Sequence, residues 1–221
     1  MIDGIARYFA DGGPMMWPIL AIIGGAVAVV GERLHFYFVV CRDRAALLVP
    51  AVVGALNADQ PETALRLADR RSAPLNAILG AAIERYRDGG SMSEIRQAVD
   101  EAAIREVPRL TRRLGTLQTF ANLATLAGLL GTIFGLQGAF RSLALTDAAQ
   151  KAAVLAAGIS EAMNTTSFGL LIAIPCLGLH ALLASVQARR AEDLDAGALR
   201  LLNYLENRPE TTGVVAGRIS A

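Results

Sequence analysis

Hydroxyl groups and glycines interrupt two largely apolar stretches of this sequence. The stretch GLLGTIFGLQGAF (128–140) carries Thr132 among four glycines, and GISEAMNTTSFGLLIAIP (158–175) carries Thr165 and Thr166. Because a hydroxyl both donates and accepts hydrogen bonds, hydroxyls on one helix face can line a path for water or protons. Small residues at such positions also let helices pack closely, so the pattern leaves both interpretations open.

A proton relay normally also needs a titratable group, and the apolar parts of the chain supply almost none. The runs 12–31, 114–140 and 162–188 contain no Asp, Glu, Lys or Arg. His180 is the one candidate, and its place near the C-terminal end of the third run favours an interfacial or packing histidine instead. If protons pass, we expect the essential carboxylate to belong to another polypeptide.

The same runs predict the fold class. The sequence is 53% hydrophobic and 19% charged, whereas soluble domains carry about 25% charged residues. Each run reaches the roughly 20 residues that a helix needs to cross a bilayer. We therefore predict an all-α integral membrane protein with three transmembrane helices. A signal peptide is the alternative for the first run, but MIDGIARYFADGG lacks a basic leader and no obvious cleavage site follows.

Arginine placement predicts the orientation. Arg42, Arg44, Arg112 and Arg113 lie near the ends of the segment between the first two runs, and the tail opens with arginines as well. The positive-inside rule places that segment and the tail in the cytoplasm, with the N-terminus outside.

The segment from Ser91 onward has helical periodicity that leads into the second run. Ser91 and Glu94 have the spacing of a capping box, and Pro108 is the expected kink. Long helices are thus expected to extend into the cytoplasm. The predicted division, from N-terminus to C-terminus, is an outward amphipathic helix (1–11), the first transmembrane helix (12–40), a cytoplasmic helical region (41–113), the second transmembrane helix (114–140), a short periplasmic link (141–161), the third transmembrane helix (162–188), and a cytoplasmic C-terminal helix and tail (189–221).

Small and polar residues form one stripe on each of the last two predicted spans, at steps of three and four residues. The second span carries Gln118, Asn122, Thr125, Gly128, Thr132 and Gly135. The third span carries Thr166, Gly169, Ala173, Cys176, His180, Ala184 and Gln187. Each stripe fits either helix packing or a polar lumen.

Other function classes find little support in the sequence. The net charge of +1 gives no nucleic-acid footprint, and two Cys and two His offer no metal spacing. The sequence shows no nucleophile–base pair or phosphate loop. We predict neither an enzyme nor a cofactor, metal or nucleic-acid site.

The two quoted stretches, in this order and on these spans, resemble the TolQ/ExbB/MotA family of proton-channel subunits, with the TolQ and ExbB branch closer. The resemblance implies a subunit of a proton channel or motor in the bacterial inner membrane. It also implies a homopentamer around a dimer of a single-span ExbD/TolR-like partner, which supplies a membrane aspartate. The machine would use the proton-motive force for work in the periplasm or at the outer membrane, such as transport, envelope maintenance or gliding.

The resemblance also assigns residues. Thr132 and Thr166 correspond to pore-lining threonines, and Glu161 corresponds to the acidic residue at the outer end of the third span. Asn164 and Thr165 lie beside Glu161 as a possible pore mouth. The residues expected to serve helix packing are Gly128, Gly131, Gly135, Gly169 and Pro175.

Each assignment has a structural alternative. Thr132 and Thr166 can serve packing or a backbone hydrogen bond alone, and an acidic Glu161 also suits a helix N-terminus. Thr125 stands where the family often has proline, and Asn164 where an aliphatic residue is usual. The alternative function is a non-conducting membrane scaffold or assembly subunit.

Overall fold

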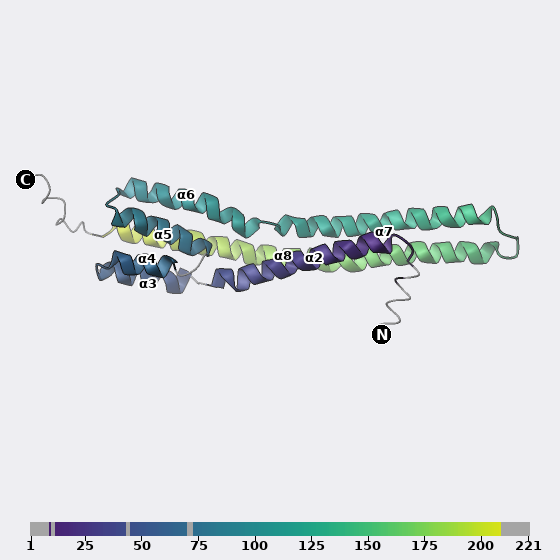
Figure 1. Ribbon diagram of the computed structural model, residues 1–221, viewed down its shortest axis with the longest axis horizontal. Coiled ribbons are helices and arrows are strands. Elements are labelled where there is room, and N and C mark those ends of the chain that lie inside the picture. The colour runs from purple at the N-terminus through teal and green to yellow at the C-terminus, as the bar shows by residue number, and fades with distance from the viewer. Residues whose placement is uncertain (1–8, 10–11, 43–44, 70–72, 209–221) are drawn as a thin grey trace, which may run out of the picture. The chain divides into compact units, whose positions relative to one another are not determined.

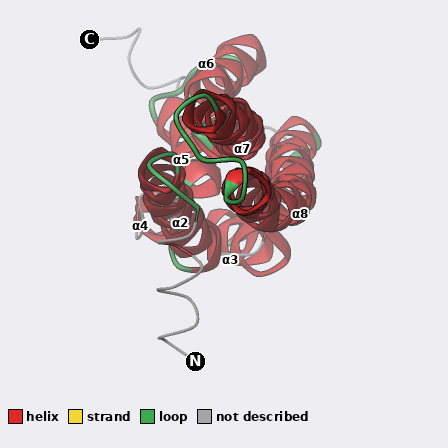
Figure 2. Ribbon diagram, turned by 90° about the vertical axis from the view of Figure 1, so that its right-hand side faces the viewer, coloured by secondary structure: helices red, strands yellow, loops and turns green. Residues whose placement is uncertain are grey.

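A computed structural model describes residue 9 and residues 12–42, 45–69 and 73–208 of the chain. The described residues form helices, turns and loops, with no strand among them, so the all-α prediction is confirmed (Figures 1 and 2). The elements are α2 (Met16–Phe38), a short 3-10 helix (Val40–Arg42), α3 (Ala45–Asn57), α4 (Pro61–Asp69), α5 (Pro74–Arg87), α6 (Met92–Thr111), α7 (Leu114–Leu143) and α8 (Lys151–Glu206).

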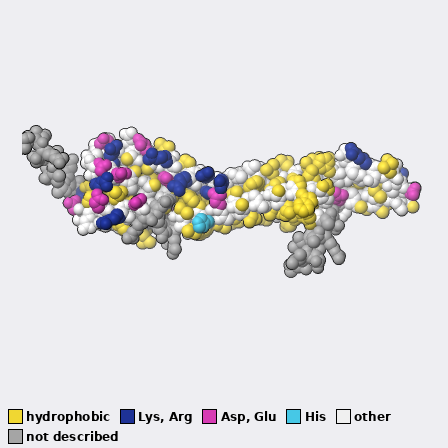
Figure 3. Space-filling model, in the orientation of Figure 1, with side chains coloured by type: hydrophobic (Ala, Val, Ile, Leu, Met, Phe, Trp, Pro, Cys, Tyr) yellow, Lys and Arg dark blue, Asp and Glu magenta, His cyan; other side chains and the backbone are white. Residues whose placement is uncertain are grey.

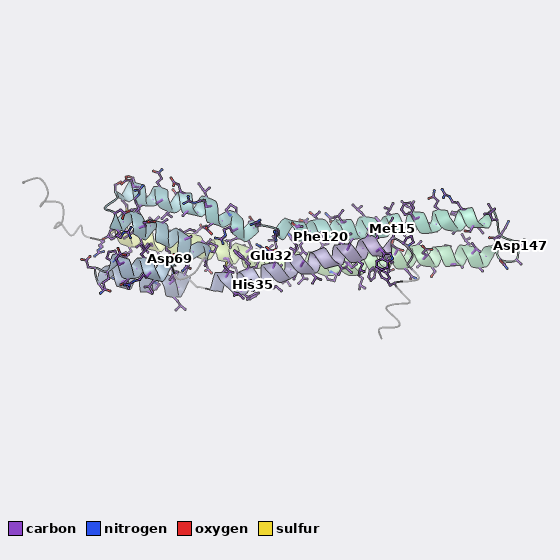
Figure 4. All side chains as sticks on the ribbon, in the orientation of Figure 1. Met15, Glu32, His35, Asp69, Phe120 and Asp147 are labelled. Atoms are coloured by element: carbon purple, nitrogen blue, oxygen red, sulfur yellow. The ribbon has the colours of Figure 1, made fainter. Side chains whose placement is uncertain are left out.

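The chain divides into two compact units. The first unit consists of Met1–His35 and Thr111–Val186, and the second of Phe36–Leu110 and Gln187–Ala221. In the first unit α7 and α8 lie side by side and run antiparallel, joined by the turn that contains Asp147 (Figures 1 and 4).

Three helical stretches are long and apolar enough to cross a membrane. They are Met16–Phe38, Met92–Leu143 and Lys151–Glu206. The surface of α7 carries exposed apolar side chains seven residues apart, because Leu126, Ile133 and Phe140 are each at least 60% exposed. Such a face suits lipid or a neighbouring helix better than water.

Helix ends differ from the boundaries of the uncharged runs. The non-helical connection between α7 and α8 covers only 144–150, within the predicted 141–161 link. Both helices continue past the apolar residues because helical hydrogen bonding does not require an apolar side chain. The predicted N-terminal helix (1–11) lies outside the described residues except for Phe9, and so does the tail beyond residue 208.

The interruption before the second span lies after Pro108 and not at it. Pro108 is inside α6, whereas Arg113 adopts a left-handed conformation with φ of 61° directly before α7. Its guanidinium is paired with the carboxylate of Glu32 in the C-terminal half of α2. A left-handed residue ends a helix, so the break follows the backbone of Arg113.

Helices α3, α5 and α6 of the second unit contact the C-terminal part of α8, and α4 packs on α3 and α5. A Cβ on Gly197 would lie 2.8 Å from the Cδ1 of Leu75, so α8 approaches α5 closely. Arg96 of α6 pairs with Glu206 of α8 at 2.6 Å. Charged side chains gather on the surface of these helices (Figure 3).

The predicted capping box at the start of α6 is confirmed. The backbone N–H of Ser91 donates to the Glu94 carboxylate at 2.7 Å, and the N–H of Glu94 donates to the Ser91 hydroxyl at 3.4 Å. This reciprocal pair satisfies donors that the first helical turn otherwise leaves unpaired.

Candidate functional site

The seam between α7 and α8 brings the two quoted stretches together. A Cβ on Gly169 would lie 2.6 Å from the carbonyl oxygen of Ala124, and one on Gly128 would lie 3.2 Å from the Cα of Thr166. The backbones therefore touch without an intervening layer of side chains, as small residues permit in membrane helix pairs.

The seam continues toward the turn between the two helices. A Cβ on Gly131 would lie 2.8 Å from the Cβ of Thr165, and one on Gly135 would lie 3.1 Å from the backbone nitrogen of Ala162. All three α7 glycines of the seam are buried. The small half of the α7 stripe thus faces α8 of the same chain.

Thr166 links the two helices directly. Its hydroxyl donates a hydrogen bond of 2.9 Å to the carbonyl oxygen of Gly128. Because a hydroxyl has one proton but two lone pairs, the Thr166 oxygen still has accepting capacity after this donation.

Thr132 lies one residue beyond the seam glycine Gly131 and is half-buried. Its hydroxyl donates to the carbonyl oxygen of Leu129 on its own helix at 2.6 Å. Thr125, on the same stripe, bonds back in the same way to Ala121 at 3.1 Å. The described contacts therefore join Thr166, but not Thr132, to the neighbouring helix by a side-chain hydrogen bond.

Thr165 is the most buried hydroxyl of the quoted stretches, with 1% of its surface exposed. Its Oγ1 lies 2.7 Å from the carbonyl oxygen of Gly12 and 2.9 Å from that of Glu161. A single hydroxyl proton is thus shared between its own helix and the segment before α2.

Glu161 and Asn164 are half-buried on α8. Glu161 lines an open cavity of about 690 Å³ together with Ser142, Ser160 and Gly13. Two residues that the sequence assigns to a possible pore mouth therefore have different surroundings. Glu161 lines the cavity, whereas Thr165 is buried and bonded to the Gly12 carbonyl.

Pro175 lies on the exposed side of α8, away from the glycine seam. With Val30, Gly31 and Cys176 it lines an apolar groove of about 420 Å³ between α2 and α8. The proline also removes one backbone donor from the helix interior, which leaves the carbonyl of Leu171 without its usual helical partner.

Two contacts of α2 and the preceding turn were not predicted from the sequence. Phe120 of α7 packs on Gly25, where a Cβ would lie 2.8 Å from the ring (Figure 4). The Gly12–Thr165 contact joins residues 153 positions apart. The glycines of α2 and of the Gly12–Gly13 pair were the available signals, but spacing within one helix does not reveal a partner on another.

Residues 70–196, more than half of the chain, match the model of the MotA/TolQ/ExbB proton channel family. The chain is 31% identical to a putative biopolymer transport protein ExbB homolog of Methanothermobacter thermautotrophicus, over 80% of this chain and 61% of that protein. It is 33% identical to the putative biopolymer transport protein ExbB-like 3 of Synechocystis sp., over 75% of this chain and 78% of that protein.

A shorter stretch of the chain is similar to a TolQ protein. The Tol-Pal system protein TolQ of Pseudomonas aeruginosa is 37% identical over 39% of this chain and 37% of its own length. The chain thus spans less than two thirds of the Methanothermobacter relative and of this TolQ. The matched region of the family model includes the whole α7–α8 seam, and the chain belongs to the MotA/TolQ/ExbB proton channel family.

Proposed function

We propose that this chain is the channel subunit of a proton-driven motor in the cytoplasmic membrane, without enzymatic activity of its own. The observation that carries the proposal is the family match over a seam that sets hydroxyls into uncharged helices. In this proposal the N-terminus and the α7–α8 turn face the periplasm, and the second unit lies in the cytoplasm. The work done is transport, envelope maintenance or gliding.

The proposed proton path runs past Thr132 and Thr166. Each hydroxyl donates a hydrogen bond to a backbone carbonyl oxygen. The distance is 2.6 Å for Thr132 and 2.9 Å for Thr166. The lone pairs that remain on each oxygen are available to accept a hydrogen bond from water or hydronium. Fixed donors of this kind orient the accepting lone pairs before the proton arrives.

The partner in this proposal supplies the titratable group. The uncharged runs hold no carboxylate, and a carboxylate inside a membrane marks ion and proton paths. We therefore propose a single-span, ExbD/TolR-like partner with an aspartate in its span. A dimer of this partner would be enclosed by a homopentamer of the present chain.

A reconstitution experiment tests the proposal. The tagged chain is purified in mild detergent from its own cells, its companions are identified by mass spectrometry, and the complex is placed in liposomes that contain a pH-sensitive dye. We expect a single-span protein with a membrane aspartate to co-purify. We also expect a potassium diffusion potential to drive proton uptake through the complex.

Matched variants of Thr166 give the decisive comparison. Thr166→Val keeps the shape of the side chain and removes the hydroxyl, so it should abolish most of the proton uptake. Thr166→Ser keeps the hydroxyl and should retain uptake. Full uptake by an assembled Thr166→Val complex would contradict the proposed role of the hydroxyl.

A second candidate function, a non-conducting scaffold, is favoured by the same seam. Gly128, Gly131 and Gly135 are all buried against α8, and the Thr166 hydroxyl already has a backbone partner. These contacts are what helix packing alone requires. The scaffold predicts a chain that purifies without an aspartate-bearing partner and liposomes that take up no protons.

A further inference from the structure

Phe9, Gly12 and Gly13, which precede α2, contact one face of α8. The ring of Phe9 contacts the ring of Phe168 at a centroid distance of 6.2 Å, and the carbonyl oxygen of Gly12 accepts from Thr165 at 2.7 Å. Gly13 lies against the carboxylate of Glu161. The α8 positions 161, 165 and 168 follow one another at steps of four and three residues, which places them on a single face.

The Thr165 hydroxyl contacts a carbonyl oxygen outside its own helix as well as one within it. A serine or threonine inside a helix commonly bonds back to a carbonyl of the preceding turn. Ser167 does this to Met163 at 2.8 Å, and Thr165 does it to Glu161 at 2.9 Å. The shorter approach of Thr165, at 2.7 Å, is to Gly12 outside the helix.

The turn at Gly13 leaves no room for a side chain above Glu161. Gly13 has a φ of +70°, a conformation that suits glycine. A Cβ at this position would overlap the carboxylate of Glu161. The backbone of the turn therefore covers Glu161 at the edge of the cavity that both residues line.

We propose that Thr165 is a positioning residue that clamps the turn at residues 12–14 onto α8, so that the turn covers Glu161 and fixes its carboxylate at the cavity wall. The inference rests on the proposed function in one respect: Glu161 would then stand where protons enter. The clamp itself is a contact within this chain.

The clamp is tested on the full complex in lipid nanodiscs with two measurements that do not depend on proton transport. The first is hydrogen–deuterium exchange of the peptide that covers residues 9–17. The second is the extent of labelling of Glu161 by dicyclohexylcarbodiimide, quantified by mass spectrometry. Loss of one hydrogen bond should raise both rates about two- to tenfold in Thr165→Val.

Three further variants complete the design. Thr165→Ser keeps the hydroxyl and should restore the slow rates. Ser167→Ala removes a hydroxyl whose hydrogen bond, to the carbonyl oxygen of Met163, lies within α8 itself, and should leave both rates unchanged. Gly13→Ala displaces the turn by another route and should raise the labelling of Glu161.

Each outcome decides the inference. Faster exchange and faster Glu161 labelling in Thr165→Val, both reversed in Thr165→Ser, support the clamp. Unchanged exchange, or faster exchange with unchanged labelling, overturns it, because the turn then does not cover Glu161 through Thr165. Proton uptake is measured in parallel, and a wild-type complex without uptake contradicts the proposed function while the two rates still decide the clamp.

Discussion

Gly169 of α8 meets the backbone of Ala124 of α7 so closely that a Cβ on Gly169 would lie 2.6 Å from the Ala124 carbonyl oxygen. The obstacle is backbone and not the flexible end of a side chain. The contact can therefore be relieved only by moving one helix against the other.

Gly169→Ala should consequently destabilise the first unit by about 1–3 kcal/mol, as overpacking in a close-packed interior does. The measurement is the apparent melting temperature of the purified protein in detergent, followed by circular dichroism. Gly178→Ala on the same helix is the control, because a Cβ there meets nothing within 4 Å. An equal loss in both variants would show that the effect does not come from the seam, because Gly→Ala by itself favours the helix.

Tyr37 should contribute a measurable hydrogen bond to the second unit. It is fully buried, and its hydroxyl donates to the carbonyl oxygen of Leu110 at 2.6 Å. Tyr37→Phe removes this donor and leaves a buried acceptor, which should lower the free energy of unfolding by about 1–3 kcal/mol.

The control is Tyr204, a tyrosine of the same unit whose hydroxyl makes its hydrogen bond at the surface. Tyr204 donates to the Asn57 side chain at 2.7 Å in an exposed contact. Tyr204→Phe should change stability by less than about 0.5 kcal/mol, since water replaces the lost partner. Similar losses for both variants would contradict the importance of burial.

Asn76 differs from Tyr37, because its buried side-chain amide has no hydrogen-bond partner among the described residues and should lower the stability of the fold. The residue is 2% exposed, and neither its Oδ1 nor its Nδ2 meets a hydrogen-bond partner among the described residues. Asn76→Leu keeps the branching of the side chain and removes an unsatisfied polar group, so it should raise the free energy of unfolding by about 1 kcal/mol. A higher melting temperature is the expected result, and a clear loss of stability would mean that the assembled protein supplies Asn76 with a partner.

The capping box of α6 should be worth about 1 kcal/mol, the usual cost of removing an N-cap side chain. Ser91→Ala removes the hydroxyl that the N–H of Glu94 uses at 3.4 Å, whereas the N–H of Ser91 still reaches Glu94. The expected result is a lower melting temperature together with faster hydrogen exchange at the first turn of α6. Exchange that stays as slow as in the unchanged chain would show that this turn does not depend on the cap.

The sequence predicts those features that a local pattern determines. The uncharged runs predict the three apolar helices, and the spacing of Ser91 and Glu94 predicts the cap, because each depends on residues near one another in the chain. The position of the break before α7 was not predicted. It lies at Arg113, whose left-handed backbone is accompanied by pairing with Glu32, 81 residues away.

In the candidate site, too, local features were predicted and contacts between distant residues were not. The stripes place Gly128 and Thr166 on faces made of small and polar residues, and the Thr166 hydroxyl donates a hydrogen bond to the Gly128 carbonyl oxygen. Their periodicity cannot say whether the face meets a lumen or the next helix of the same chain. Thr165 was grouped with the pore mouth by its neighbours in sequence, whereas its burial depends on the distant Gly12.

The backbone contact at the α7–α8 seam limits how this protein can move. Without a layer of flexible side chains between Gly128 and Gly169, neither helix can slide along the other by one residue without driving a Cβ into main-chain atoms. We therefore expect α7 and the part of α8 that packs on it to move together as one rigid body whenever the protein changes conformation. Displacement would then be taken up at surfaces outside the seam, and a disulfide engineered across the hairpin should leave activity intact.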